Sequence, residues 1–305
     1  MAENVANPSR PTQAMVFVLI ALLPAAGLGV YFFGLQALLI ILVTVTSCVA
    51  FEAIYQKFAK KPITITDLSA VTTGLLMAMV MPPAIPLWMP VVGAFVAIII
   101  VKQLFGGLGK NFLNPALAGW GFLAVSYSSA MLESYTYPLA GWLNSGELAS
   151  ATPLYRLNTM GVPPVIEDYI VALFGNVPGA IGTTATIALV LGGLFLLVTK
   201  TISWHIPVSF IATVFGLTFI MGEYASYQLI IGGLMLGAIF MATDPATSPK
   251  AWYGKLIFGV GCGVLVALIR LFGGYAEGMA FAILLMNLAV PLIDRIKGFK
   301  RRRAI

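Results

Sequence analysis

Long apolar runs separated by short polar stretches dominate the chain. A hydrocarbon core about 30 Å thick is crossed by a helix of about 20 apolar residues. Ten runs approach or reach that length, at residues 15–33, 36–54, 68–81, 88–105, 112–131, 182–198, 204–221, 225–242, 255–272 and 277–294. The pattern predicts an all-α polytopic membrane protein with about ten transmembrane helices.

Composition agrees with this interpretation. Hydrophobic residues make up 60% of the 305 residues and charged residues 9%, whereas soluble domains carry roughly a quarter charged residues. The net charge of +6 owes much to a basic tail at 295–305, which suits anionic lipid. We expect contact with a lipid bilayer and no binding of nucleic acid.

The distribution of Lys and Arg predicts the orientation, because cytoplasmic loops carry an excess of both. With the N-terminus inside, 15 of the 17 fall on the cytoplasmic side, Arg156 lies outside, and Arg270 lies near the outer end of the ninth helix. Both termini are therefore expected in the cytoplasm. The segment 132–180 becomes extracytoplasmic, and its length exceeds that of an ordinary loop.

The two groups of five helices share a pattern. Gly74-Leu75-Leu76-Met77 leads to a Pro-rich stretch at 81–88, and Gly233-Leu234-Met235-Leu236 leads to another at 244–252. Five helices per group invert the second group, so we expect two inverted five-helix repeats. Transporters with inverted repeats place substrate sites at the repeat interface, near broken helices. A solute channel or carrier is therefore one functional hypothesis.

These features divide the chain into five parts. They are a cytoplasmic N-terminal tail (1–13), a first repeat (14–131), an extracytoplasmic loop (132–180), a second repeat (181–294) and a basic cytoplasmic tail (295–305).

The sulfur and imidazole content limits the chemistry. An iron–sulfur cluster usually takes four thiolates, and the chain has only Cys48 and Cys262. The single histidine, His205, cannot build a metal site alone. We predict neither a metal site nor a catalytic side chain.

Four stretches resemble a known family. They are 67–88, 109–116, Ala151-Thr152-Pro153-Leu154 and 240–249. They are similar to the D-type subunit of the Rnf complex, the ion-translocating ferredoxin:NAD+ oxidoreductase, and to the homologous B-type subunit of the Na+-translocating NADH:quinone reductase. The shorter N-terminal region of this chain favours Rnf. The family's fold is itself similar to urea-channel architecture.

The resemblance implies a redox subunit of a multi-subunit translocase in the prokaryotic inner (plasma) membrane. Such a subunit helps to couple electron transfer to Na+ or H+ translocation. The implied partners are the other Rnf subunits, including a flavin-bearing G-type subunit and the iron–sulfur subunits. The ferredoxin and NAD sites are expected on those other subunits.

The resemblance also implies a flavoprotein with a covalent flavin. In the family, FMN is joined through its phosphate to a threonine, and a flavin transferase makes the bond. The matching residue is Thr152, although Ala149 and Ser150 stand where the family has a hydroxyl residue and a glycine. The homologous quinone-reductase subunit also holds a non-covalent riboflavin, which this sequence neither requires nor excludes.

Several residues are candidate partners of the phosphate. Arg156 follows Thr152 by four residues, and Arg270 is a second candidate. Gly182, Thr183 and Thr184 are expected to open the sixth helix, whose free N–H groups suit an anion. The same residues also suit close helix packing.

Polar residues within the apolar runs are further candidates. Asn114 precedes a proline and can satisfy freed backbone groups or hydrogen-bond a flavin ring. Asp244, beside Thr243, is a candidate for the ion pathway, or an N-cap for the following segment. Glu52 is expected to reach the cytoplasmic surface or to pair with Lys57.

Overall fold

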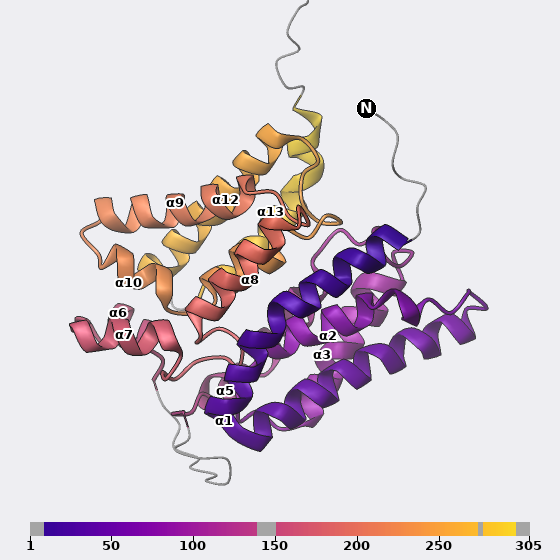
Figure 1. The fold of residues 1–305 in the computed structure, drawn as a ribbon, viewed down its shortest axis with the longest axis horizontal. Coiled ribbons are helices and arrows are strands. Elements are labelled where there is room, and N and C mark those ends of the chain that lie inside the picture. The colour runs from indigo at the N-terminus through magenta and orange to yellow at the C-terminus, as the bar shows by residue number, and fades with distance from the viewer. Residues whose placement is uncertain (1–8, 139–150, 274–276, 297–305) are drawn as a thin grey trace, which may run out of the picture.

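The computed structural model describes residues 9–138, 151–273 and 277–296. Within these ranges the chain is helical and forms no sheet (Figure 1). Residues 1–8, Ala149, Ser150 and the tail from 297 onward lie outside the described residues.

The first half of the chain forms five α-helices, one 3-10 turn and one π-helix. They are α1 (Ser9–Phe58), the 3-10 turn η1 (Ile65–Asp67), α2 (Ser69–Met79), α3 (Trp88–Phe95), the π-helix η2 (Val96–Gln103), α4 (Pro115–Ser126) and α5 (Ser128–Glu133). Gly34, at φ 70° and ψ −155°, divides α1 into two helices. That division falls where the sequence separates the runs 15–33 and 36–54.

The second half begins with two short helices inside the segment predicted as a loop. The elements are α6 (Pro153–Asn158), α7 (Ile166–Phe174), α8 (Thr186–Val198), α9 (His205–Ile220), α10 (Ala225–Ile230), α11 (Leu234–Leu236), the π-helix η3 (Gly237–Met241), α12 (Trp252–Phe272) and α13 (Met279–Arg295). Figure 1 shows α6 and α7 at the end of the molecule away from the beginning of α1 and the end of α13.

One predicted helix is broken in the structure. The run 225–242 forms α10, then a non-helical turn, then α11 and η3. Gly232 in that turn has φ 70°, a conformation that glycine adopts without a steric penalty. The prediction of a continuous helix was wrong here, because the apolar pattern continues through the break and the pair Gly232-Gly233 is its local sequence signal.

Two other helix bounds also differ from the sequence prediction. The run 112–131 is interrupted at Tyr127, which lies between α4 and α5 at φ −131° and ψ 45°. The sixth predicted helix begins at Thr186 and not at Gly182.

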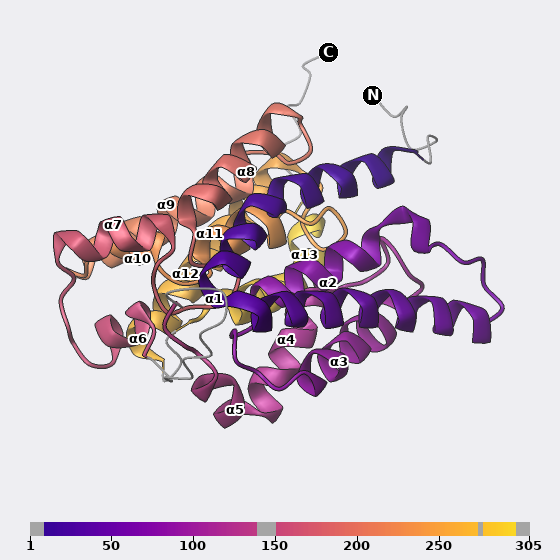
Figure 2. The same ribbon diagram turned by 60° about the horizontal axis from the view of Figure 1, so that its bottom comes forward.

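Close packing of small residues joins the helices in each half. A Cβ added to Gly74 on α2 would lie 2.7 Å from the Cα of Val45 on α1. A Cβ added to Gly263 on α12 would lie 2.6 Å from the Cβ of Thr213 on α9. Small residues allow such close approach in membrane helices. Figure 2 shows the indigo and purple helices of the first half beside the orange and yellow helices of the second.

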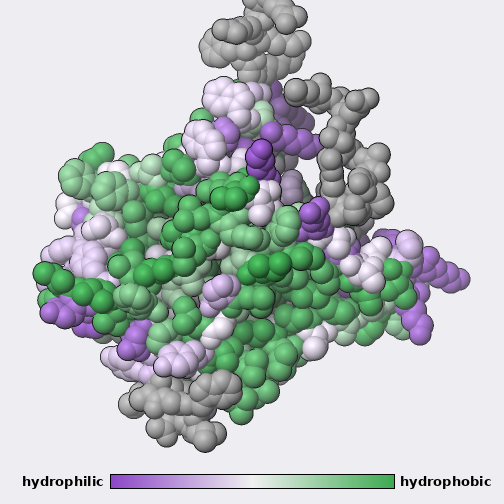
Figure 3. Space-filling model, in the orientation of Figure 1, coloured by the Kyte–Doolittle hydropathy of each residue, from purple (hydrophilic) through white to green (hydrophobic). Residues whose placement is uncertain are grey.

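The surface carries many large apolar side chains. Figure 3 shows hydrophobic residues over most of the face it presents. Among the most exposed are Leu191 and Val198 on α8, Ile220 on α9 and Leu292 on α13. Extended apolar surface of this kind marks contact with a membrane or a partner protein.

Length and composition qualify two of the described helices as membrane spans. They are Thr12–Phe58 and Trp252–Phe272, and shorter apolar helices include Ser69–Met79, Trp88–Gln103, Pro115–Ser126, Thr186–Val198 and His205–Ile220. The arrangement of ten spans in two inverted repeats stays a prediction.

Candidate functional site

A cavity of about 420 Å³ lies where the two halves of the chain meet. Its size falls within the range of about 300–1,000 Å³ typical of small-molecule sites. The lining comes from the ends of α2 and α5, the beginning of α6, the turn before α8, the break between α10 and α11, and the beginning of α13. Most of the lining is apolar, which suits a flat organic ligand.

Thr152 lies half-buried in the lining of this cavity. It is the N-cap of α6, and its Oγ1 accepts a hydrogen bond from the N–H of Tyr155 at 3.3 Å. Pro153 occupies the first helical position, where its missing N–H costs nothing. Local sequence therefore fixes the start of α6 and places Thr152 in the cavity lining.

Two buried polar atoms belong to residues of the cavity lining. Trp120 Nε1 and Thr184 Oγ1 have no hydrogen-bond partner within the described part of the chain. Unpartnered buried donors are rare in native proteins and call for an explanation. Both atoms are shielded from the cavity as well as from solvent, so they contact no open space there.

The turn before α8 differs from its predicted role. Gly182 donates its N–H to Met79 O at 2.8 Å, so that group is occupied. An added Cβ on Gly182 would overlap the Met79 side chain. Gly182 is therefore a packing residue, while Thr183 and Thr184 lie in the cavity lining. Because α8 begins after them, these residues do not form its first turn.

The charged groups around the cavity are acidic. Glu133 and Glu277 line it, and the described lining contains no Lys, Arg or His. Arg156 is exposed and lines a separate small hollow with Asp168 and Tyr227. The structure therefore does not bring Arg156 into the cavity that Thr152 lines.

Arg270 also has a different environment from the one predicted. Its buried guanidinium donates from Nη1 to Gln228 O at 2.6 Å and from Nη2 to Ile231 O at 3.4 Å. Nη2 also pairs with Glu277 Oε1 at 3.3 Å. Arg270 thus satisfies carbonyl groups freed at the end of α10 through Nη1 and Nη2, while its buried Nε has no hydrogen-bond partner among the described residues.

Glu277 completes the same break, a role that sequence reasoning missed. Its Oε2 accepts a hydrogen bond from the N–H of Gly233 at 2.6 Å. An unsatisfied backbone group in an apolar surrounding costs several kcal/mol, so the pair of Arg270 and Glu277 makes the broken helix possible. The sequence signal for this role was the presence of opposite charges, Arg270 and Glu277, on the two sides of Gly273.

Asn114 has a structural role outside the cavity lining. Its side chain caps α4 by accepting from Leu117 N–H at 3.2 Å, and its Nδ2 donates to Met241 O at 3.2 Å. Its backbone N–H donates to Asn287 Oδ1 at 3.0 Å. These contacts tie α4 to η3 and α13, which agrees with the backbone role and not with a flavin contact.

The two ion-pathway candidates lie just after η3. Thr243 donates its hydroxyl back to Ile239 O at 2.6 Å. Asp244 accepts from Ala246 N–H at 3.1 Å and from the Thr247 hydroxyl at 3.3 Å. Among the described residues no group of three or more metal-binding side chains forms a site.

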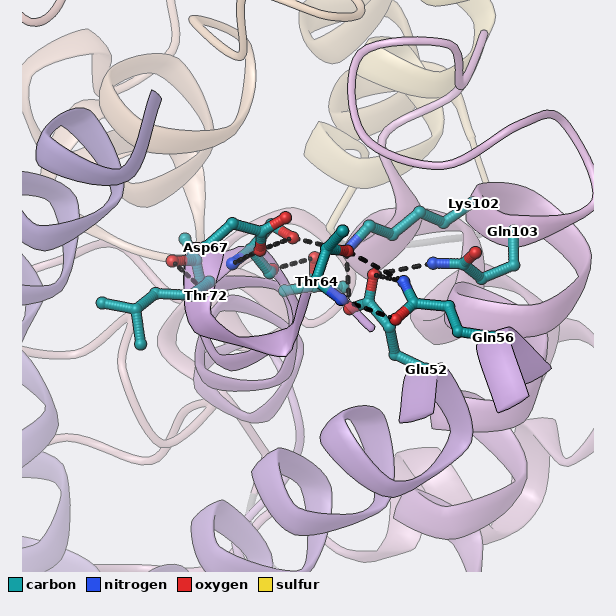
Figure 4. Close-up of polar contacts among 10 residues, drawn as sticks. Glu52, Gln56, Thr64, Asp67, Thr72, Lys102 and Gln103 are labelled. Atoms are coloured by element: carbon teal, nitrogen blue, oxygen red, sulfur yellow. Dashed lines mark hydrogen bonds and ion pairs between the residues drawn. The ribbon is translucent and has the colours of Figure 1, made fainter. Parts of the chain in front are cut away.

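A second polar cluster lies where α1, α2 and η2 meet (Figure 4). Glu52 accepts from Lys102 Nζ at 2.9 Å and from Gln103 Nε2 at 2.7 Å. Glu52 is 1% exposed and Lys102 2%. The expectation that Glu52 reaches the surface or pairs with Lys57 was wrong. Glu52 and Lys102 each lie near the end of an apolar run, and their opposite charges were the sequence signal that could have predicted this pair.

Comparisons with known proteins cover nearly the whole chain. The family model described as "NQR2, RnfD, RnfE family" matches residues 4–301. The chain is 46% identical over 280 residues to the D-type subunit of the Na(+)-translocating ferredoxin:NAD(+) oxidoreductase complex of Acetobacterium woodii, covering 91% of this chain and 86% of the relative.

Two further relatives show the same similarity. The D-type subunit of the proton-translocating ferredoxin:NAD(+) oxidoreductase complex of Clostridium ljungdahlii is 43% identical, with 93% of this chain and 89% of the relative covered. The D-type subunit of the ion-translocating oxidoreductase complex of Citrobacter koseri is 38% identical, with 94% and 93% covered.

Proposed function

The chain belongs to the NQR2, RnfD and RnfE family, and from this premise we propose that it carries FMN joined through its phosphate to Thr152. Like its D-type relatives, it is part of an ion-translocating ferredoxin:NAD+ oxidoreductase complex, the Rnf complex. We further propose that the flavin carries electrons between partner subunits while the complex moves Na+ or H+.

One observation supports the flavin most directly. Thr152 lines a cavity of small-molecule size, and most of the wall of that cavity is apolar. The residues present therefore fit a flavin tethered at Thr152.

The chain's own groups would hold the cofactor without taking part in bond making during turnover. Thr152 would supply the attachment oxygen, and the apolar lining would exclude water from the ring. When bound, FMN supplies one- or two-electron redox chemistry, and the protein contributes position and electrostatics. The acidic side chains of Glu133 and Glu277 would contribute negative charge to that environment, although the ion pair with Arg270 partly neutralises Glu277.

The partners follow from the complex to which the relatives belong. Other Rnf subunits would hold the ferredoxin and NAD sites, and a flavin transferase would load Thr152. The charge distribution supports placing Thr152 on the extracytoplasmic side of a prokaryotic plasma membrane, so its flavin would exchange electrons with partners there.

Denaturing electrophoresis tests the attachment. After coexpression with a flavin transferase, the unsubstituted protein should fluoresce under ultraviolet light, and intact mass spectrometry should show one FMN adduct. Thr152→Ala should give a dark band. Thr159→Ala is the matched control, because Thr159 is an exposed threonine at the other end of α6, and its band should stay bright.

Two results would contradict the proposal. A bright Thr152→Ala band would refute the site assignment. An unsubstituted protein with no bound flavin, together with solute flux in liposomes, would favour the carrier hypothesis that the broken helix suggests.

A further inference from the structure

The short helix α6 is held by its own small apolar cluster. Leu154 and Leu157 are buried at 2% and 6% exposure against Ala172, Tyr227 and Ile231. Six residues alone do not make a stable helix in water, so α6 depends on these tertiary contacts. Since Thr152 caps α6, whatever fixes α6 also fixes a group attached to Thr152.

A chain of polar contacts continues from α6 into the protein. Asn158 Oδ1 accepts from Gln228 Nε2 at 2.8 Å, and Asn158 Nδ2 donates to Arg270 O at 3.1 Å. Gln228 is 0% exposed, and its backbone carbonyl accepts from Arg270. Arg270 pairs with Glu277, which lines the cavity. The last residue of α6 is thereby connected to the cavity wall.

We propose that Asn158 and Gln228 are positioning residues: their hydrogen bond holds α6 against the break between α10 and α11 and so fixes a flavin attached at Thr152 relative to the cavity. This inference rests on the proposed function for the flavin itself. The docking of α6 rests only on its apolar cluster and these hydrogen bonds. The two parts can therefore be tested separately.

Asn158→Ala removes both contacts while leaving Thr152, the cavity lining and the apolar cluster unchanged. Each of the two lost hydrogen bonds should contribute about fivefold, so the local opening equilibrium of α6 should rise about 25-fold. Hydrogen–deuterium exchange of the α6 peptide in the purified full chain should accelerate by that factor. Asn158→Asp, which keeps the acceptor for Gln228 but not the donor to Arg270, should give an intermediate rate.

The flavin supplies the second measurement. In Asn158→Ala the band should remain fluorescent after electrophoresis, because Thr152 is intact, but iodide should quench the native flavin more strongly. Asn111→Ala is the matched control: Asn111 is also a buried amide, bonded to Leu113 O at 3.0 Å before α4. It should alter neither α6 exchange nor iodide quenching.

Distinct failures separate the claims. Unchanged exchange in Asn158→Ala, or an equal change in Asn111→Ala, would overturn the docking role. If Asn158→Ala carries fluorescent flavin and its α6 exchanges faster, but iodide quenches that flavin no more than in the unsubstituted protein, the flavin-positioning role would be overturned. A dark unsubstituted band would overturn the proposed function and flavin positioning with it, while the exchange result would still decide whether Asn158 docks α6.

Discussion

Replacing Glu52 by glutamine should destabilise the junction of α1, α2 and η2. The Glu52 carboxylate accepts from Lys102 Nζ at 2.9 Å and from Gln103 Nε2 at 2.7 Å, and both members of the ion pair are almost fully buried. Removing one partner of a buried pair costs about 3–5 kcal/mol, because the other charge is left uncompensated. Since about 1.4 kcal/mol is a factor of ten, local opening should rise by roughly two to three and a half orders of magnitude.

A buried thiol beside the pair makes this opening measurable. Cys48 lies one helical turn before Glu52 and is 0% exposed. In a Cys262→Ala background it is the remaining cysteine of the sequence. A maleimide reacts with a thiol only once it is accessible and ionised, so the labelling rate of Cys48 in detergent reports opening. Glu52→Gln should label far faster than its parent.

Two comparisons show whether the ion pair is the cause. Lys57→Met removes an exposed charge from the same helix and should leave the labelling rate unchanged. The double variant Glu52→Gln/Lys102→Met should recover much of the loss, because replacing both members of a buried pair is often nearly neutral. Labelling of Glu52→Gln at the parental rate would refute the stabilising role of the pair.

Three further substitutions should each give a measurable change. Gly182→Val should lower stability by about 1–3 kcal/mol, because its side chain would overlap Met79, whereas Gly27→Val meets open space and should be neutral in thermal unfolding. Asn287→Leu should cost about 1–3 kcal/mol, since Asn114 N–H and Thr247 O lose their partner; an unchanged melting temperature would contradict this. Glu277→Gln should raise the flavin midpoint potential in a redox titration, because it removes a negative charge from the cavity lining; a fall would contradict the electrostatic argument.

The apolar pattern of the sequence located most of the helices. Apolar runs of nearly membrane-spanning length favour helices, and capping residues at their ends indicate where those helices begin. Asn114 before Pro115 begins α4 as capping rules predict. Thr152 was identified from the resemblance, and Thr183 and Thr184 were predicted at the N-terminus of a helix that begins later, yet all three line one cavity.

Long-range pairing could not be predicted in the same way. Lys102 belongs to a cytoplasmic turn by charge counting, yet it lies buried against Glu52, fifty residues earlier. Arg156 follows Thr152 by four residues, but its side chain lines a different hollow with Asp168 and Tyr227. Spacing along a helix does not reveal which neighbour a charged side chain will find once distant helices pack.

The break between α10 and α11 explains why Arg270 and Glu277 are both needed. A continuous helix over 225–242 would satisfy its own backbone, whereas the break brings Ile231, Gly232 and Gly233 to the cavity lining. Breaking it frees polar groups that lipid cannot satisfy. Arg270 satisfies carbonyls on one side of the break and Glu277 the N–H of Gly233 on the other. Arg270 therefore supports the break that brings Ile231 and Gly232 to the cavity, so its replacement should lower stability whether or not a flavin is bound.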